Sequence, residues 1–254
     1  MENRILIEDE HLVAVKKNAG ELVVADRFGL EKSPLLHRLG AHLRERGHKP
    51  DASGRDLYPV HRLDRDTSGV VLFAKNQDAH RRLSMMFEGR EMKKLYWALA
   101  CGSPDWDNLL CRVPLRRAEG KKGRGRALVD FREGKEAETD FTVKERLGNV
   151  TWLEARPLTG RLHQIRVHLR VLGHPVLFDE TYWEKTWKCE ILTDLAPQRM
   201  TLHARSIAFK HPFSGKEVAI EAPMDEDMRA LLQRLQGALN EKSHKNQGSI
   251  KALD

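Results

Sequence analysis

The sequence predicts an α+β fold with a mainly antiparallel central β-sheet and flanking helices. Two observations favour it: strand-like segments outnumber helical ones, and several strands follow one another as hairpins rather than through crossover helices. One hairpin is expected between residues 139–146 and 150–156, around Gly148 and Asn149. A second is expected between residues 201–210 and 217–221, around a turn that contains Pro212 and Gly215.

The other elements follow from local patterns. Residues 4–8 and 12–16 alternate apolar and polar side chains like two short strands. Ser33 and Pro34 are a cap and a first helical residue, so a helix is expected to reach Arg46. The next elements are expected to be a buried strand over 70–74, a helix over 77–88 and a strand over 93–100.

The carboxyl end is expected to be a helix followed by a flexible tail. The helix is predicted from Met224 to about residue 236, with Gly237 as its stop. The remaining residues are polar and contain several lysines. The predicted organisation is therefore one domain over residues 1–238 and a flexible tail over 239–254.

The segment from His61 to Gly69 reads HRLDRDTSG and places the carboxylate of Asp64 between two arginines, Arg62 and Arg65. Nearby positive charge favours the ionised form of a carboxylate, and hydrogen bonds to it fix its direction. An active site that needs an ionised acid has a use for this arrangement. A turn whose aspartate caps backbone N–H groups would give the same pattern, so on this motif alone both readings stay open.

A second segment predicts a helix of about three turns, from Thr159 as N-cap to a stop at Gly173. Its apolar residues fall on one stripe, and Arg166 lies at the rim of that stripe. An arginine in this position can reach inward to a carboxylate, although many rim arginines only extend over the surface. The residues of the stripe are Leu162, Ile165, Leu169 and Leu172.

Five motifs, taken in order, resemble the pseudouridine synthases of the RluA type. They are HRLD with TSG in 61–69, KLYWA in 94–98, GKEAET in 134–139, TGRLHQIRVHL with LGHPV in 159–176, and LHA with FKHPF in 202–213. The matches cover roughly residues 4–223. The resemblance implies an isomerase (an intramolecular transferase) that converts uridine to pseudouridine in RNA, and a pseudouridine synthase catalytic domain over residues 1–238. The motifs begin close to the first residue, so no N-terminal RNA-binding module is expected.

The resemblance also implies roles for individual residues. It assigns catalysis to Asp64, Arg62, Tyr96 and Arg166, and we expect substrate contact beside them from His61, Thr67 and Ile165. Asp64 matches the essential aspartate and Arg166 the arginine that pairs with it. Tyr96 matches the tyrosine that stacks on the extruded uracil, and a flat aromatic ring suits that purpose. Arg62 matches an arginine linked to opening the RNA.

Two segments depart from the family pattern. The family usually has Lys-Pro where this chain has Lys16 to Gly20, and Gly-Asp-x-x-Tyr-Gly where this chain has Phe178 to Trp183. The catalytic motifs are intact, so the departures bear on which RNA site is modified and not on the chemistry.

Most of the net charge of +7 lies in residues 112–126, which hold seven basic residues and one acidic residue. A glycine- and arginine-rich loop there can follow a phosphate backbone, and we expect it to contact RNA. A solvated loop without a partner is the alternative. The residues expected to bind RNA are Arg116, Arg117, Lys121, Lys122, Arg124 and Arg126.

Composition excludes several other classes. No apolar run approaches 18 residues and the first 20 residues lack a signal-peptide core, so no membrane association is expected. Three scattered cysteines suit a reduced, cytoplasmic protein. His163 and His168 lie about 140° apart on a helix, which does not suit a shared metal ion. We expect no metal and no cofactor.

Two questions stay open at this point. A non-catalytic RNA-binding or chaperone protein with the same basic surface is the alternative function, although binding alone has no use for a buried acid. The RNA partner can be ribosomal RNA, transfer RNA or both. Nothing in the sequence resembles a coiled-coil heptad, so a monomer is expected.

Overall fold

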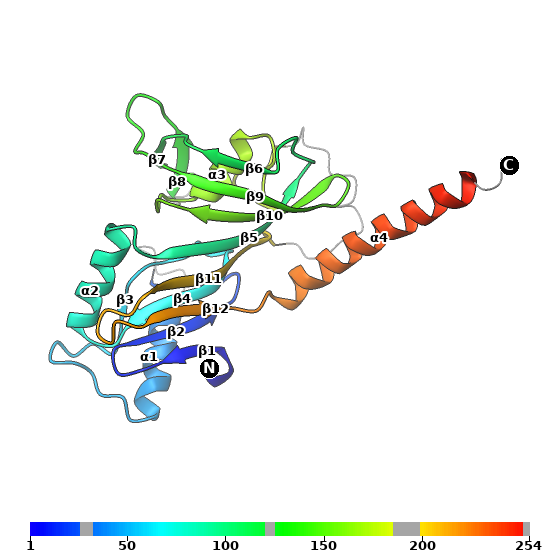
Figure 1. Ribbon diagram of the computed structural model, residues 1–254. Coiled ribbons are helices and arrows are strands. Elements are labelled where there is room, and N and C mark those ends of the chain that lie inside the picture. The colour runs from blue at the N-terminus through cyan, green and yellow to red at the C-terminus, as the bar shows by residue number, and fades with distance from the viewer. Residues whose placement is uncertain (26–32, 120–124, 185–198, 251–254) are drawn as a thin grey trace.

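The computed structural model describes residues 1–25, 33–119, 125–184 and 199–250, and of residues 240–250 only the backbone (Figure 1). A short 3₁₀ helix over Glu2–Arg4 precedes the first strand. The strands of the main sheet are β1 (Ile5–Glu8), β2 (Leu12–Lys17), β3 (Tyr58–Pro59), β4 (Ser68–Ala74), β5 (Lys93–Cys101), β6 (Asn108–Cys111), β9 (Thr139–Arg146), β10 (Val150–Pro157), β11 (Leu202–Lys210) and β12 (Glu217–Glu221). A separate ribbon is formed by β7 (Leu115–Glu119) and β8 (Gly125–Val129). The α-helices of the described ranges are α1 (Leu35–Glu45), α2 (Gln77–Glu88), α3 (Gln164–Val171) and α4 (Glu226–Ile250).

The main sheet has ten strands in the order β1-β2-β4-β11-β5-β10-β9-β6, with β12 paired to β11 and β3 paired to β4. Strand β11 runs parallel to β4, and the other pairs of named strands are antiparallel. The predicted α+β class with a mainly antiparallel sheet is therefore confirmed. Both predicted hairpins form, as β9–β10 and β11–β12. Within the described ranges, no helix has the length and apolar character needed to cross a membrane.

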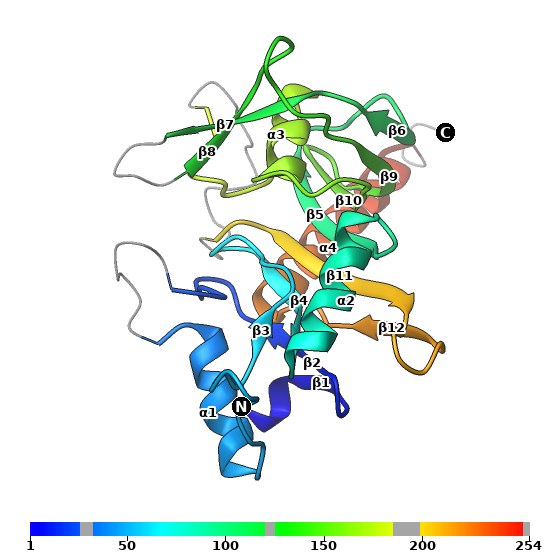
Figure 2. The same ribbon diagram turned by 90° about the vertical axis from the view of Figure 1, so that its left-hand side faces the viewer.

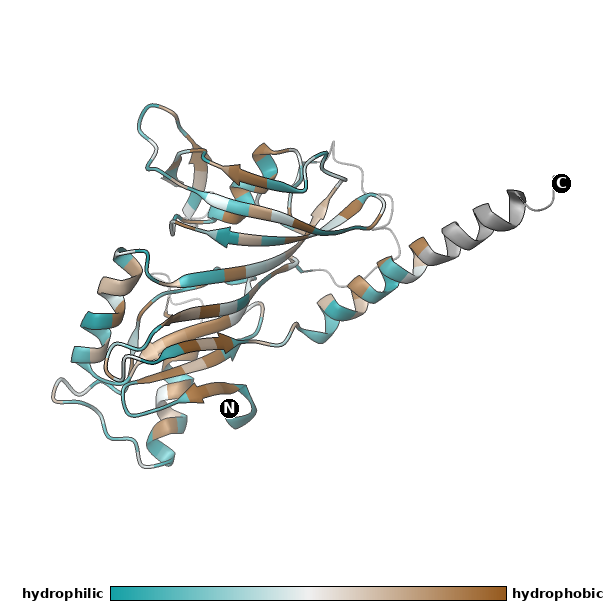
Figure 3. Ribbon diagram, viewed as in Figure 1, coloured by the Kyte–Doolittle hydropathy of each residue, from teal (hydrophilic) through white to brown (hydrophobic). Residues whose placement is uncertain are grey.

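The helices cover the two faces of the sheet in pairs. Because successive residues of a strand point to opposite faces, Val71 and Phe73 of β4 pack with α1, whereas Val70 and Leu72 pack with α2. In the same way, one set of β5 residues packs with α3 and the alternate set with α4. Hydrophobic residues follow the strands and the inner sides of these helices (Figure 3).

The side chain of Tyr96 lies at the seam between two of these core clusters. It packs against the cluster under α1 and also against the cluster under α3. These two clusters lie on the same face of the sheet, on either side of the central strands β4, β11 and β5. Figure 2 shows α1 and α3 in separate halves of the molecule, with the central strands between them. The seam is therefore where a pocket can open without interrupting either core.

Gly69 allows the two parallel strands to approach each other at this seam. Its φ is +116°, and a Cβ there would lie 2.1 Å from the carbonyl oxygen of Ala204 on β11. A distance below 3.0 Å cannot be accommodated by a backbone atom, so only glycine fits. Next to it, Oγ of Ser68 lies 2.8 Å from Nδ1 of the buried His203. The start of β4, just after the charged turn, is thereby fixed against β11.

Four expectations about individual elements need correction. The helix expected from Thr159 begins only at Gln164, because the preceding residues form a turn held by side chains. The stop at Gly173 is confirmed, and this glycine has a φ of +83°. The stretch expected to be a basic loop forms the β7–β8 ribbon on both sides of residues 120–124. Strand β6 was not predicted at all.

The fourth correction concerns the carboxyl end, where α4 continues through Gly237 to Ile250 and protrudes from the sheet (Figure 1). A glycine inside a helix costs about 1 kcal/mol but does not end it without a left-handed conformation. Leu235 is buried before it and Leu239 packs on the same cluster after it, so the helix gains from continuing. The predicted helix end at Gly237 is therefore wrong, whereas the flexible tail over 239–254 stays a prediction, and residues 251–254 lie outside the described part. The boundary of the domain at residue 238 stays a prediction.

Candidate active site

The turn that carries Asp64 joins β3 to β4 and is held by backbone contacts. The N–H of Thr67 donates to the carbonyl of Asp64 at 3.2 Å. Lys17, at the end of β2, is fully buried, and its amine donates to the carbonyls of Arg65 (2.7 Å) and Asn18 (2.9 Å). Burial lowers the pKa of Lys17 to about 8. These contacts fix the turn on the end of the sheet.

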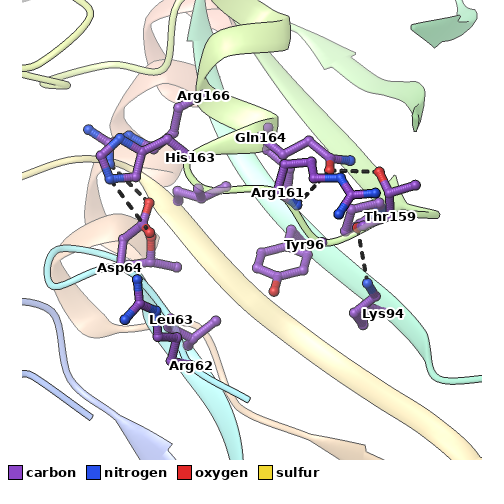
Figure 4. A pocket seen from close by; sticks show the side chains of 15 residues that line it. Arg62, Leu63, Asp64, Lys94, Tyr96, Thr159, Arg161, His163, Gln164 and Arg166 are labelled. Carbon is purple, nitrogen blue, oxygen red and sulfur yellow. Dashed lines mark hydrogen bonds and ion pairs between the residues drawn. The ribbon is translucent and has the colours of Figure 1, made fainter. Parts of the chain in front are cut away.

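The cationic partner of Asp64 is not one of its sequence neighbours. Nε of Arg65 donates to the carbonyl of Gly20 at 3.0 Å, which points it away from the carboxylate. Arg62 is exposed at the edge of the pocket (Figure 4). Instead, Nη1 of Arg166 on α3 donates to Oδ2 of Asp64 at 2.9 Å. The two arginines beside Asp64 in the sequence therefore play no part in its shortest ion pair.

Arg166 is itself held by a second carboxylate. Its Nε and Nη2 each donate to Asp179 at 2.7 Å, a bidentate pair in which Asp179 is 1% exposed. Burial opposes the charge of Arg166, but the hydrogen bonds and charges of Asp179 and Asp64 prevail and raise its pKa. The guanidinium is therefore a fixed cation whose third nitrogen, Nη1, donates to Asp64.

The turn before α3 is organised by the side chain of Gln164. Its Oε1 accepts from the hydroxyl of Thr159 (2.7 Å) and from the backbone N–H of Arg161 (3.0 Å), while its Nε2 donates to the carbonyl of Glu138 (2.8 Å). The chain then enters the helix through His163, which has a left-handed conformation with φ +52°. These bonds replace the N-cap that the sequence suggested at Thr159.

A pocket lies at the seam of the sheet between these elements (Figure 4). Tyr96 projects from β5 into it, and Asp64 and Lys94 lie on either side of its ring. Burial raises the pKa of Tyr96, and the nearby charge of Asp64 raises it further, so the phenol stays neutral. The pocket thus combines an aromatic wall, one carboxylate and several cations. Its lining includes Arg62, Asp64, Thr67, Lys94, Tyr96, Thr159, Arg161, His163, Ile165 and Arg166.

Lys94 and Thr67 are two polar groups of this pocket with spare hydrogen-bonding capacity. The amine of Lys94 donates to the carbonyl of Thr159 at 3.2 Å, and burial lowers its pKa to about 8. The hydroxyl of Thr67 is buried and has no hydrogen-bond partner among the described residues. The amine of Lys94 is available to the polar edge of a ligand, whereas the hydroxyl of Thr67 lies just beneath the pocket surface.

Six of the residues expected at the site line this one pocket: Arg62, Asp64, Thr67, Tyr96, Ile165 and Arg166. His61 does not line it. Its Nε2 accepts from the N–H of Leu72 at 3.0 Å, and its ring stacks on Phe87 with centroids 4.9 Å apart. The geometry therefore gives His61 a packing role in place of the expected substrate contact.

Three of the six basic residues expected to bind RNA lie in the described part of the chain. Arg116 and Arg117 are exposed on β7, and Arg116 forms an ion pair with Asp130 at 2.6 Å. Arg126 is half-buried on β8. Lys121, Lys122 and Arg124 lie outside the described residues.

The sequence reasoning missed Asp179, Tyr182 and His163 as members of the site. Nε2 of His163 lies 3.8 Å from Oδ1 of Asp64, and its Nδ1 lies 2.9 Å from the hydroxyl of Tyr182. Asp179 and Tyr182 are the two residues of the segment 178–183 that keep the family's pattern, and that agreement was the available signal. It was read only for its departures.

Comparison with known proteins agrees with this geometry. A family model described as RNA pseudouridylate synthase matches residues 11–170. The ribosomal large subunit pseudouridine synthase C of Pasteurella multocida is 38% identical over 246 residues, which are 97% of this chain and 71% of that protein. The protein of the same name from Escherichia coli K12 is 38% identical over 237 residues, 92% of this chain and 70% of that protein.

Two solved human structures are similar in fold. The RNA pseudouridylate synthase domain containing 1 protein superposes with a TM-score of 0.64 and 27% identity, over 92% of this chain and 94% of the other. The domain containing 4 protein superposes with a TM-score of 0.74 and 23% identity, with the same coverage of both chains. The match of the family model and the two bacterial relatives establish the family. The chain belongs to the RNA pseudouridylate synthases of the RluA type, enzymes that isomerise uridine to pseudouridine in RNA.

Proposed function

We propose that this pseudouridine synthase modifies uridines of large-subunit ribosomal RNA and that Asp64 is its catalytic residue. Relatives named ribosomal large subunit pseudouridine synthase C share 38% of the aligned residues over more than 90% of this chain, which supports the choice of RNA. The assignment of Asp64 rests on one observation: its carboxylate is fixed by Arg166 at the edge of a pocket whose wall is Tyr96.

The pocket residues suit the steps that the isomerisation requires. A uridine stacked in RNA must first be extruded, at a cost of a few kcal/mol. The ring of Tyr96 provides a stacking face for the extruded uracil, and Arg62 at the pocket edge is placed to enter the gap left in the RNA. Stacking and gap filling both lower the cost of keeping the base outside the helix.

The reaction then breaks the N-glycosidic bond, turns the base and forms a C–C bond to the same ribose. No atom is gained or lost overall. Asp64 supplies a carboxylate whose position is set by Arg166, which in turn is fixed by Asp179. Because two ion pairs lock the guanidinium, the carboxylate needs no rearrangement when the nucleotide enters. The uracil, once detached, is confined between Tyr96 and Ile165.

The direct test compares Asp64→Asn with Asp66→Asn, a matched change at an exposed acid two residues further along the same turn. We expect Asp64→Asn to bind a large-subunit ribosomal RNA transcript with nearly wild-type affinity and to form no pseudouridine, whereas Asp66→Asn modifies it normally. Carbodiimide mapping measures the product. Wild-type turnover by Asp64→Asn would refute the catalytic assignment of Asp64, whereas RNA binding without any turnover by the wild-type protein would favour a protein that only binds RNA.

The substrate is tested separately. Pseudouridines are mapped in ribosomal and transfer RNA from cells with and without the gene, and we expect the loss of sites in large-subunit ribosomal RNA alone. Loss of a transfer RNA site alone would contradict the proposed substrate while leaving the chemistry intact. We further infer that the enzyme acts as a monomer in the cytoplasm, because its three scattered cysteines suit a reducing compartment and its sequence has no coiled-coil heptad. Sedimentation of the purified protein tests the oligomeric state, and cell fractionation tests the location.

A further inference from the structure

The hydroxyl of Tyr182 touches three polar groups from two parts of the fold. It accepts a hydrogen bond from the N–H of Ala127 on β8 at 2.9 Å. It also lies 3.2 Å from the carbonyl oxygen of Ala127 and 2.9 Å from Nδ1 of His163. The side chain is 2% exposed, so water cannot replace these partners easily. This one oxygen therefore connects the β7–β8 ribbon with the residue that faces Asp64.

The hydroxyl has one proton and two acceptors within reach. The carbonyl of Ala127 is the longer contact and Nδ1 of His163 the shorter one. If Nδ1 carries a hydrogen, it donates to the hydroxyl, and the phenol proton goes to Ala127. If Nδ1 is bare, the phenol proton goes to His163. The tautomer of the imidazole therefore decides the direction of this hydrogen bond, and the reverse also holds.

The surroundings of the other ring nitrogen, Nε2, decide between these two tautomers of His163. Nε2 of His163 lies 3.8 Å from Oδ1 of Asp64. Burial lowers the pKa of His163, although the charge of Asp64 opposes this, and the lowered pKa favours a neutral ring with a single N–H. A bare Nε2 would turn its lone pair toward a carboxylate, which is repulsive. A protonated Nε2 presents the positive end of its dipole, which is favourable.

We propose that Tyr182 is a positioning residue for the reaction, because its hydroxyl proton goes to Nδ1 of His163 and thereby turns the N–H of Nε2 toward the carboxylate of Asp64. The proposal deepens the proposed function, since it gives the carboxylate a second support. Arg166 holds Oδ2 by a hydrogen bond, and His163 faces Oδ1 with a fixed dipole. At 3.8 Å the dipole orients the carboxylate without occupying its lone pair, so Oδ1 stays available to the substrate.

The ring of Tyr182 is fixed as firmly as its hydroxyl. The guanidinium of Arg166 lies 5.0 Å from the ring centroid and that of Arg126 lies 5.3 Å from it. The ring of His163 meets it edge to face, with centroids 5.5 Å apart. The hydroxyl oxygen cannot move away from Nδ1 without breaking these contacts. Rotation of the O–H bond, which sets the direction of its proton, is the motion that remains.

Nitrogen-15 NMR of the imidazole rings tests the proposal in the unliganded wild-type enzyme at pH 7, with His163→Gln used to assign the signals. We expect His163 to be neutral, with a protonated Nε2 and a bare Nδ1. A protonated Nδ1 would overturn the proposal. This measurement needs no RNA and no turnover, so it remains decisive whether or not Asp64 proves to be catalytic.

Tyr182→Phe then tests the consequence for catalysis, with Tyr58→Phe as the matched control. Tyr58 is also a buried tyrosine whose hydroxyl is hydrogen-bonded, to Ser53 and Asp51, but it lies outside the pocket. In Tyr182→Phe we expect a mixture of His163 tautomers and a fall in kcat of about tenfold, equal to about 1.4 kcal/mol. KM for RNA should change by less than about twofold, because the phenyl ring keeps its contacts with Arg126 and Arg166 and no charged group is removed. Unchanged kcat, or an unchanged tautomer in this variant, would contradict the role of the hydroxyl, and Tyr58→Phe should alter neither quantity.

Discussion

Nη1 of Arg166 donates to Oδ2 of Asp64 at 2.9 Å, across a separation of 102 residues in the sequence. Nε and Nη2 of the same guanidinium donate to Asp179. One cation thus orients the carboxylate that we propose to be catalytic and neutralises an acid that is 1% exposed. On this proposal, stability and catalysis depend on the same side chain.

Replacing Arg166 separates these two contributions. In Arg166→Leu, Asp179 is left as a buried carboxylate without a cation, so we expect a loss of about 3–5 kcal/mol in the free energy of unfolding together with lost turnover. In Arg166→Lys the charge remains, but one ammonium cannot reproduce the bidentate pair, so stability should lie between the two and turnover should stay low. Urea unfolding and pseudouridine assays measure both effects.

Arg170, one turn further along α3 and paired with Glu184, is the matched control. Arg170→Leu should shift the free energy of unfolding by no more than about 0.5 kcal/mol. An Arg166→Leu variant as stable as this control would show that Asp179 does not depend on the ion pair.

Local patterns explain what could be predicted from the sequence. The helix expected over 77–88 coincides with α2, because Asn76 caps it and its apolar residues keep a helical spacing. The family resemblance predicted that Arg166 pairs with Asp64, because its place at the rim of an apolar stripe allows either an inward or a surface orientation. Its partner Asp179 did not follow, since the pairing depends on how the segment after α3 folds back on the helix.

Two predictions of a helix end that depended on a single residue were wrong. Thr159 has the side chain of an N-cap, but its hydroxyl donates to Oε1 of Gln164 and accepts from the N–H of Glu138, so it belongs to a turn instead. Gly237 resembles a stop, but burial of Leu235 on the sheet outweighs its low helix propensity. In both cases contacts distant in sequence decided the outcome, and no local rule contains them.

The ring of Tyr96, more than its hydroxyl, should govern activity. Tyr96→Phe keeps the stacking face, so we expect it to retain most of the turnover. Tyr96→Ala removes a stacking contact of about 1–3 kcal/mol, which corresponds to a loss of roughly tenfold to a hundredfold. Single-turnover rates on ribosomal RNA transcripts compare the two variants. Equal losses in both would transfer the role to the hydroxyl.

The β7–β8 ribbon should carry much of the salt dependence of RNA binding. We expect replacement of Arg117, Lys121, Lys122 and Arg124 by Gln to weaken RNA binding and to flatten the plot of log affinity against log salt. Each lost phosphate contact should reduce the slope by about 0.7–0.9. Arg126 is left unchanged because it lies against the ring of Tyr182. Filter binding at several salt concentrations measures the slope.

Arg81 and Arg82 provide the control for this experiment. They are exposed and lie on α2, which covers the opposite face of the sheet from α3. Replacing both by Gln should leave the slope as in the wild type. A ribbon variant with a wild-type slope would mean that these charges are solvated in the complex.

Acid should destabilise the enzyme partly through His61. Burial, reinforced by the charge of Lys94, lowers the pKa of His61 to about 3, whereas the unfolded chain protonates it near 6.5. Between these values the unfolded state binds more protons, so the free energy of unfolding falls as the pH drops from 6.5 toward 3, by up to about 1.4 kcal/mol per pH unit. In His61→Gln the amide oxygen can still accept from the N–H of Leu72 and does not titrate. Urea unfolding at pH 7 and pH 5 should therefore show a smaller difference in His61→Gln than in the wild type, while the exposed His37→Gln keeps the full difference. An identical difference in all three proteins would mean that His61 is protonated as readily in the folded enzyme as in the unfolded chain.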